Sequence, residues 1–495
     1  MFSAMKHLLW IPLGLCLAAC AVSPPDRAVS PPNVIVMMAD DLGWGDIGAN
    51  GGTVIHTPHI DALAERGVLL TDGYVSAAVC SPSRAGLYTG RQQQRHGFEY
   101  NIAGRDTTMG MATEQTTIAD MARAKGYATG LIGKWHLGKR NEHHPLSRGF
   151  DEYYGMLAGS STYIDSRVDG VESWPARNAP TVRSESNAIY DGWEPVEVKR
   201  YITDVFRDKA VDFIERHRDA PFFLVLTPNA PHTPLQATKE YLDRYRHIED
   251  ASERIYAAMV AAIDDYVGAV AAKLRELGLE ENTMFVFLSD NGCAGYVVER
   301  CSNGPLRGNK RYYFEGGIRI PFIVSWPAGL PQGVKYSQPA IALDLYATIA
   351  AAIGSGATAQ DSVNLLPHLR GDTDDAPHEY LFWRAKPNIA VRKGNWKMWK
   401  VNKSDLDFSA ITDRAARRLP MQAWPQDSPL GQLTLLYDLS ADIGERRNVA
   451  AENPEIVAEL EAAIAGWDAA MGEPSWPAFR STLDEIDGQT VHLFF

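Results

Sequence analysis

The strongest constraint on the fold of this 495-residue chain is a set of short, almost wholly apolar runs. They lie at residues 33–38 (NVIVMM), 222–226 (FFLVL) and 284–288 (MFVFL). A strand that is apolar at nearly every position is buried on both faces, as in parallel sheets covered by helices. Residues 320–326 predict a further strand. The chain is therefore expected to build a large, doubly covered sheet.

Helical patterns separate these strands, notably at residues 116–125 and 252–277. Strands that alternate with helices predict a mostly parallel α/β sheet with helices on both faces. Short polar clusters follow the predicted strands, and open α/β sheets bind ligands at this edge.

The pattern changes near residue 379, where antiparallel strands replace the α/β alternation. Strands are predicted at 380–383, 389–398 (with a turn at Gly394-Asn395) and 433–439, and an amphipathic helix at 453–471. We therefore assign residues 33–378 to a larger domain that carries the site and 379–495 to a smaller C-terminal α+β domain, an antiparallel sheet plus a helix.

The N-terminal segment has the pattern of an export signal. Residues 1–19 contain Lys6 and an apolar stretch too short to span a bilayer. The run L-A-A-C ending at Cys20 resembles a bacterial lipobox, with Cys20 lipidated, and residues 20–32 form a Pro-rich tether. No Asp follows Cys20, which favours the outer membrane of a Gram-negative bacterium. The alternative is a plain signal peptide and a periplasmic protein.

The net charge of −13 argues against nucleic acid as a partner. It would also repel a polyanionic substrate in bulk solution. Any anion site must therefore be a local positive pocket.

Two pairs of polar residues follow buried strands. Asp40 and Asp41 come directly after the first strand, and Asp290 and Asn291 end the strand at 284–288. Adjacent carboxylates repel each other unless a cation lies between them. An all-oxygen ligand set suits Ca²⁺ or Mg²⁺ rather than Zn²⁺. The sequence thus predicts one site for a hard cation.

Four further segments carry candidate chemistry. The run CSPSRAGLYTG at residues 80–90 places a thiol at the start of an apparent helix, where anions are favoured. In the run GKWHLG, Lys134 and His136 would face one pocket if the chain is extended there. His232 lies between prolines that restrict its backbone, and Lys310 follows the run PLRGN.

These segments resemble the signatures of the sulfatase family. Residues 80–90 match every fixed position of its C-x-P-S/T-R-x(4)-T-G signature, and residues 133–151 resemble the second signature. The resemblance covers residues 33–327 in family order, and within the family the chain is similar to arylsulfatase A/B-like bacterial polysaccharide sulfatases. It implies an alkaline phosphatase-like fold with a smaller C-terminal domain.

Carried over residue by residue, the resemblance implies a site around a modified cysteine. A formylglycine-generating maturation enzyme would oxidise Cys80 to formylglycine. One Ca²⁺, or Mg²⁺, would be held by the modified Cys80 together with Asp40, Asp41, Asp290 and Asn291. Lys134, His232 and Lys310 would bind the sulfate of a sulfated carbohydrate.

The same resemblance implies a reaction in which the formylglycine hydrate attacks sulfur. Arg84 would orient the hydrate, and Asp290 would help to activate it. His232, with a share for Lys310, would protonate the leaving alkoxide, and His136 would be the base that restores the aldehyde.

Several alternatives remain open from the sequence. Cys293 and Cys301 are either a disulfide, which an oxidising compartment would allow, or two free thiols. The chain could instead be a phosphonate monoester or phosphodiester hydrolase on the same scaffold. It could also be a glycan-binding lipoprotein in which Cys80 is never modified.

Overall fold

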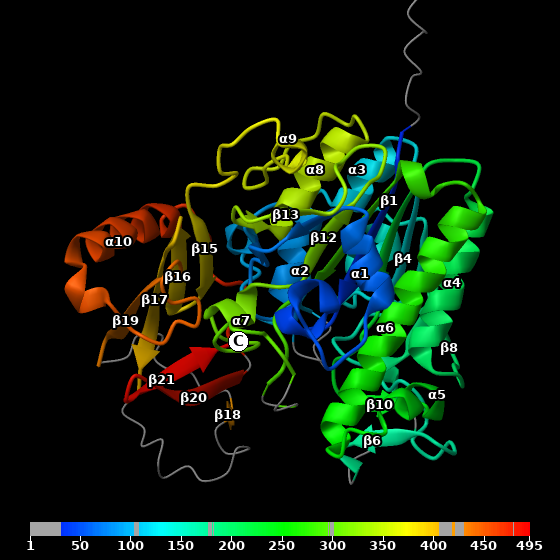
Figure 1. Cartoon of the computed structure of the whole chain (residues 1–495), viewed down its shortest axis with the longest axis horizontal. Coiled ribbons are helices and arrows are strands. Elements are labelled where there is room, and N and C mark those ends of the chain that lie inside the picture. Colours follow the sequence, from blue (N-terminus) through cyan, green and yellow to red (C-terminus); the bar gives the residue numbers. More distant parts are fainter. Residues whose placement is uncertain are drawn as a thin grey trace, which may run out of the picture. The chain divides into compact units, whose positions relative to one another are not determined.

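The apolar run that begins at Asn33 forms the central strand β1 (Asn33–Ala39) in the computed structural model of the protein (Figure 1). The structure describes residues 31–102, 108–176, 181, 183–295, 297, 301–404, 418–420, 430–478 and 480–495. Cys20, the signal segment and most of the tether lie outside the described residues.

The main sheet has ten strands, and its middle is parallel. Their order is β13 (Val334–Tyr336), β2 (Val68–Leu70), β12 (Phe322–Ser325), β11 (Thr283–Ser289), β1, β9 (Phe222–Thr227), β4 (Ala128–Lys134), β5 (Glu152–Met156), β7 (Ile189–Asp191) and β8 (Glu194–Val196). From β11 to β5 every pair is parallel. The predicted buried strands are therefore confirmed, although β12 runs antiparallel to β11 and β7 antiparallel to β5.

Helices cover both faces of this sheet. Alternate residues of β1 enter two separate cores: Ile35 and Met37 in one, Val34 and Val36 in the other. The first face is covered by α1 (Pro58–Glu65), α4 (Ile202–Arg216) and α6 (Ala251–Glu276), the second by α2 (Cys80–Thr89), α3 (Ile118–Ala124) and α8 (Leu345–Ala352). Burial on both sides explains why β1 is apolar throughout.

Helix α6 is long and apolar enough to cross a membrane, and it alone among the described helices meets that test. In the structure 78% of its most apolar window is buried, and α6 packs against α4 and α1. Its composition is thus accounted for by its place in the core.

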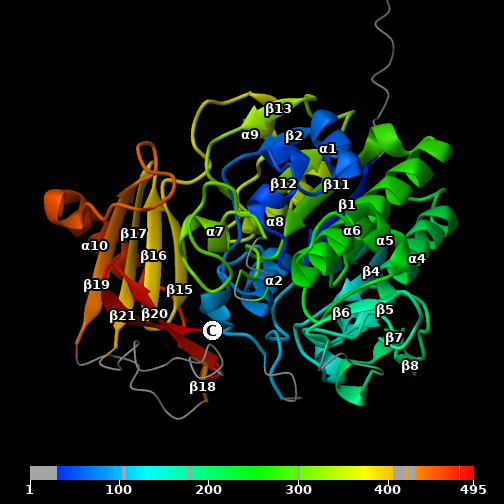
Figure 2. The ribbon, with the colours of Figure 1, turned by 60° about the horizontal axis from the view of Figure 1, so that its bottom comes forward.

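A second sheet lies beside the first (Figure 2). It contains β15 (Leu381–Ala385), β16 (Asn388–Lys393), β17 (Trp396–Lys403), β21 (Gln489–Phe494), β20 (Arg480–Ile486) and β18 (Arg418–Pro420), and β19 (Gln432–Asp438) pairs with β17. Helix α10 (Pro454–Asp468) covers one face through a small apolar core. The predicted antiparallel sheet and helix are confirmed, while the exact domain boundary at 378/379 stays a prediction.

The remaining short elements connect these layers. They are β3 (Gly73–Tyr74), β6 (Glu172–Trp174), β10 (Leu235–Ala237), β14 (Ala340–Ile341), α5 (Lys239–Leu242), α7 (Glu315–Ile318) and α9 (Leu366–Arg370). Of these, α7 matters most for the site, because it lies directly after the segment that carries Lys310.

Candidate active site

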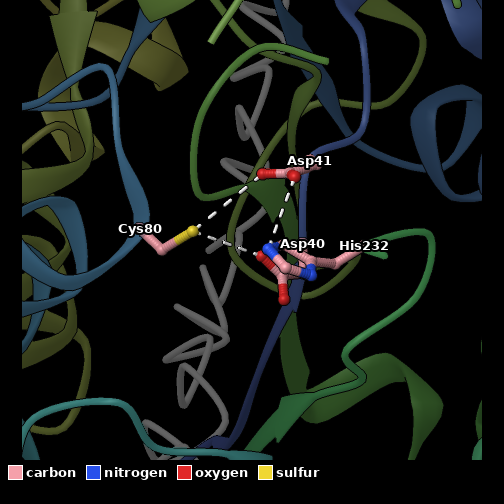
Figure 3. A group of neighbouring side chains, drawn as sticks. All are labelled: Asp40, Asp41, Cys80 and His232. Atoms are coloured by element: carbon pink, nitrogen blue, oxygen red, sulfur yellow. Dashed lines mark hydrogen bonds and ion pairs between the residues drawn. The ribbon is translucent and has the colours of Figure 1, made fainter. Parts of the chain in front are cut away.

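Residue 80 lies where three segments of the chain meet. Cys80 is the first residue of α2 and is only 2% exposed. Its Sγ lies 3.5 Å from Asp40 Oδ1, 4.0 Å from Asp41 Oδ1 and 3.0 Å from Lys310 Nζ. In Figure 3 the Cys80 side chain points at the two aspartates, and His232 reaches them from the other side. The expected convergence on residue 80 is therefore present.

The backbone at the ends of β1 and β11 brings the carboxylates together. The Asp40 N–H donates to Ala230 O (3.0 Å), and the Asp290 N–H donates to Ala39 O (3.1 Å). Asp41 has a left-handed backbone (φ 70°), which is uncommon for a residue with a side chain, and its N–H donates to Asp290 Oδ1 at 3.2 Å. The chain thus turns sharply at Asp41 and keeps all three carboxylates within one buried cluster.

Arg84 ties the start of α2 to the end of β11. Its Nε and one terminal nitrogen donate to Asp290 Oδ2 at 2.9 and 2.8 Å, and its other terminal nitrogen donates to Lys134 O at 2.9 Å. Arg84 is fully buried, four residues after Cys80 on the same helix. Because residues four apart share a helix face, Arg84 holds residue 80 in register with Asp290.

Two lysines add positive charge at the cluster. Lys134 Nζ lies 2.7 Å from Asp40 Oδ2, and Lys310 Nζ lies 2.5 Å from Asp41 Oδ1. Both are at most 4% exposed. The three carboxylates balance Lys134, Lys310 and Arg84, so a bound divalent cation would be needed to make the pocket locally positive for an anionic substrate.

His232 is oriented by its own loop. Its Nδ1 lies 2.7 Å from Thr233 O, so Nδ1 carries a proton and Nε2 faces Asp41 Oδ2 at 3.8 Å. Tyr163, which is fully buried, donates to the carbonyl of Asn229 and lies 2.8 Å from His232 O. Tyr163 therefore supports this loop. No spacing in the sequence predicts this role.

His136 reaches the cluster by a different route from the one expected. The sequence predicts an extended chain that points Lys134 and His136 to the same side. The backbone of His136 is instead left-handed (φ 62°), directly after β4 ends at Lys134. The prediction of an extended chain is wrong at this residue. The charges of Lys134, Arg84 and Asp40 still act on the pKa of His136. Its buried Nδ1 has no hydrogen-bond partner among the described residues.

The charges of the site oppose the effect of burial. Burial alone would raise the pKa of Asp40 and of Asp41. Lys134 and His232 nevertheless bring the pKa of Asp40 below its usual range, and Lys310 and His232 do the same for Asp41. Burial and neighbouring Asp40 raise the pKa of Asp290 to about 6, against the pull of Arg84. Burial lowers the pKa of His136, and Lys134 lowers it further, so the ring is neutral.

The thiol at position 80 is a poor nucleophile as it stands. Burial raises the pKa of Cys80 to about 12, and Asp290 adds to the rise. The thiolate, not the thiol, attacks an electrophile, so an unmodified Cys80 would be inert near neutral pH.

The cluster also fits a hard divalent cation. Asp40, Asp41, Cys80 and His232 each offer a ligand atom, all within 4.8 Å of one another. Asn291 donates from Nδ2 to Asp41 Oδ1 (2.7 Å), while its Oδ1 is buried without a hydrogen-bond partner among the described residues. An unpartnered buried amide oxygen beside carboxylates is the donor type that Ca²⁺ and Mg²⁺ take.

Cys293 and Cys301, for which the sequence leaves a disulfide or two free thiols open, lie next to this site. Cys293 and Cys301 form a disulfide, with their Cα atoms 6.2 Å apart, so the two-thiol alternative does not hold in the structure. The Cys293 carbonyl accepts a hydrogen bond from the Lys310 N–H at 2.9 Å. The bridge thus anchors the segment that follows Asn291 close to the loop that carries Lys310.

Known proteins share this chain's sequence and architecture. A family model described as Sulfatase matches residues 32–355. The N-acetylgalactosamine-6-sulfatase of Mus musculus is 31% identical over 467 residues, covering 90% of this chain and 86% of that enzyme. The steryl-sulfatase of Mus musculus is 31% identical over 514 residues, covering 88% of this chain and 81% of that enzyme.

Among solved structures, Ps i-CgsB in complex with k-i-k-neocarrahexaose superimposes with a TM-score of 0.77 at 32% identity. The match covers 90% of this chain and 94% of that one. The likeness therefore extends through the second sheet as well as the main one.

Proposed function

The chain belongs to the sulfatase family and is a sulfuric ester hydrolase, and from this premise we propose that it removes sulfate from a sulfated carbohydrate by means of formylglycine at position 80. The observation that carries the proposal is the position of residue 80, within 3.0–4.0 Å of Lys310, Asp40 and Asp41 at the start of a buried helix. A tetrahedral anion placed there would meet two lysines and the N-terminus of α2.

The carbohydrate assignment is supported by the relatives. One similar enzyme acts, by its name, on N-acetylgalactosamine 6-sulfate, and one similar structure holds a neocarrahexaose. The steryl-sulfatase relative is equally similar in sequence, so a sterol sulfate belongs in the same assay as a competing substrate.

We propose that Asp40, Asp41, Asp290, Asn291 and the modified residue 80 hold Ca²⁺, with Mg²⁺ as the alternative ion. When bound, the cation would supply charge stabilisation for sulfate oxygens, and the formylglycine hydrate would supply an oxygen nucleophile. Arg84 then serves to fix Asp290 and the start of α2 relative to each other.

The chain's own residues divide the remaining work. Lys134 and Lys310 present their ammonium groups to the sulfate oxygens. His232 holds one proton on Nδ1 against Thr233 O, so a second proton, on Nε2, is the one that passes to the leaving alkoxide, and the ring becomes neutral. His136, kept neutral by burial and by Lys134, is the base that takes a proton during regeneration.

Export as a lipoprotein remains part of the proposal. The lipobox at Cys20 and the Pro-rich tether would hold the enzyme at the outer membrane, where external polysaccharide fragments are met. Metabolic labelling with a fatty acid tests this directly: label that survives in a Cys20→Ala variant contradicts the anchor.

The function is tested with protein matured in a host that installs formylglycine. Peptide mass spectrometry first establishes whether residue 80 is an aldehyde. Release of sulfate is then measured from sulfated monosaccharides, sulfated galactan oligosaccharides, a sterol sulfate, an aryl sulfate and an aryl phosphodiester. We expect the highest kcat/KM on a sulfated sugar. A clear preference for the phosphodiester, or an intact thiol in active protein, would contradict the proposal.

A further inference from the structure

A second group of buried charges lies between the main sheet and the second sheet, away from residue 80. We call it the interface network. Its members are Asp72, Tyr74, Glu315, Arg319, Arg392, Lys397 and Glu445, all at most 9% exposed. The mechanism uses none of them. Lys397 and Arg392 come from β17 and β16 of the second sheet, while Glu315 is the first residue of α7, which follows the loop of Lys310.

Lys397 bridges two carboxylates at the centre of this network. Its Nζ lies 2.9 Å from Glu315 Oε1 and 2.9 Å from Glu445 Oε1. The other oxygen of Glu445 accepts the Glu315 N–H at 2.5 Å. Since Glu315 is the first residue of α7, both its side chain and its backbone are held by groups outside the main sheet.

Helix α7 in turn packs on the turn that carries Asn291. The Gly292 N–H donates to Gly317 O at 3.1 Å. A Cβ built on Gly292 would lie 1.8 Å from Gly316 O, so no side chain fits between α7 and this turn. A displacement of α7 would therefore be transmitted directly to Asn291, the neighbouring residue.

The same short helix supports the loop of Lys310. The Gly316 N–H donates to Arg307 O at 2.7 Å, and a Cβ on Gly317 would lie 2.0 Å from Tyr312 O. Arg307 also donates to Glu445 O at 2.6 Å. Lys310 lies between Arg307 and Tyr312, so both ends of its loop rest on α7 and one end is also bonded to Glu445.

We infer that Lys397 and Glu445 are positioning residues of the active site, which act through α7 to place Asn291 and Lys310. This inference rests on the proposed function, because it takes Asn291 as a cation ligand and Lys310 as a sulfate-binding residue. Groups that orient metal ligands typically change metal affinity 10- to 100-fold when removed, and small displacements of binding groups cost about as much in rate.

The test compares Lys397→Met with Lys400→Met in formylglycine-bearing protein. Lys400 lies three residues further along β17 and pairs instead with Glu461 of α10 (2.5 Å), so it controls for loss of a lysine ion pair from the same strand. Affinity for Ca²⁺ is measured by calorimetry on chelator-stripped protein, and kcat and KM are measured on the best sulfated sugar.

For Lys397→Met we expect Ca²⁺ to bind about tenfold more weakly and KM to rise about tenfold. Lys400→Met should stay within twofold of the unsubstituted protein in both. A folded Lys397→Met protein that matches Lys400→Met in both quantities overturns the inference. If Lys397→Met does not fold, Glu445→Gln decides: a loss of about threefold in Ca²⁺ affinity is expected, and no loss overturns the inference.

Failure of the proposed function would look different. Unsubstituted protein that neither binds Ca²⁺ nor releases sulfate from any sugar contradicts the proposed function itself. If the unsubstituted protein binds Ca²⁺ and releases sulfate, and the variants match it in Ca²⁺ affinity and KM, only the positioning role is contradicted.

Discussion

The protein buries two groups of charge of equal size, and they differ in how completely they are paired. The active-site cluster contains three carboxylates and three cations: Asp40, Asp41, Asp290, Lys134, Lys310 and Arg84. The interface network also has three of each, in Asp72, Glu315, Glu445, Arg319, Arg392 and Lys397. Net charge therefore does not separate a catalytic cluster from a structural one.

Pairing does separate them. In the interface network every carboxylate oxygen has a donor within 3.2 Å. Among the described residues of the active-site cluster, Asp41 Oδ2 has only the contact with His232 Nε2 at 3.8 Å, and Asn291 Oδ1 is buried with no partner. Buried oxygens without a partner also occur elsewhere in the protein, on Gln93 and Gln94 for example. Those of Asp41 and Asn291 differ because they lie side by side among carboxylates, the arrangement of oxygens that binds a hard cation.

Replacing Cys80 by Ala should abolish turnover without disturbing the fold. Removal of a nucleophile typically lowers kcat by about 10⁴-fold or more. The thiol is small, so we expect the free energy of unfolding to change by about 1 kcal/mol or less. Sulfate release and urea denaturation check the two halves. Sulfate release near the original rate from Cys80→Ala would show that another group is the nucleophile.

Replacing Glu315 by Ala should destabilise the protein strongly. The substitution leaves Lys397 and Arg319 buried without this carboxylate, and breaking a buried ion pair typically costs about 3–5 kcal/mol. Urea denaturation measures the loss. Glu461→Ala, which removes the partner of the more exposed Lys400, is the control and should cost far less. Equal losses would mean that the interface network is no more stabilising than a surface pair.

Calcium should stabilise the folded protein through the active-site cluster. At about 100 times its dissociation constant, a ligand that binds only the folded state adds about 2.7 kcal/mol. The melting temperature should therefore rise with Ca²⁺ and fall on chelation. Asp41→Asn should remove the response, whereas Asp265→Asn, at a carboxylate paired with Arg244, should keep it. A response that survives Asp41→Asn would place the ion elsewhere.

The smallest effect concerns pH and the interface network. Burial raises the pKa of Glu445 from 4.5 to about 7, with Lys397 opposing the rise and Glu315 adding to it. Between these values the folded state keeps a proton that the unfolded chain has lost, so stability falls as pH rises through this range. Glu445→Gln should flatten that part of the curve of melting temperature against pH. An unchanged curve would show that Glu445 does not titrate there.

Local sequence was enough to predict most of the secondary structure. Strands β1, β9 and β11 follow from continuous apolar runs, and the turn at Gly394-Asn395 separates β16 from β17 as expected. Strand direction was beyond such reasoning: residues 322–325 form the predicted strand, yet it pairs antiparallel with β11. An apolar run records burial on both faces but not which way the chain enters the sheet.

Short strands, and strands without an apolar pattern, could not be predicted from the sequence. No strand is predicted at residues 163–193, but this segment contains β6 and β7, each three residues long. The hairpin of β20 and β21 was not predicted at all. Three residues cannot display a period of two. Burial does alternate over residues 480–484 of β20, but the buried Ser481 is polar, so the sequence carries no matching apolar pattern.

The chemistry available to this protein can be read from its residues: a thiol in a distinctive context, carboxylates at strand ends, and the lysines and histidines of recognisable segments. Which oxygens remain unpaired, and that Lys397 of the second sheet supports the loop of Lys310, depends on how the two sheets pack. Glu315 lies 82 residues from Lys397 and 130 from Glu445, so no local spacing links them. Such contacts arise when two separately built sheets pack and each buried charge must find its partner on the other.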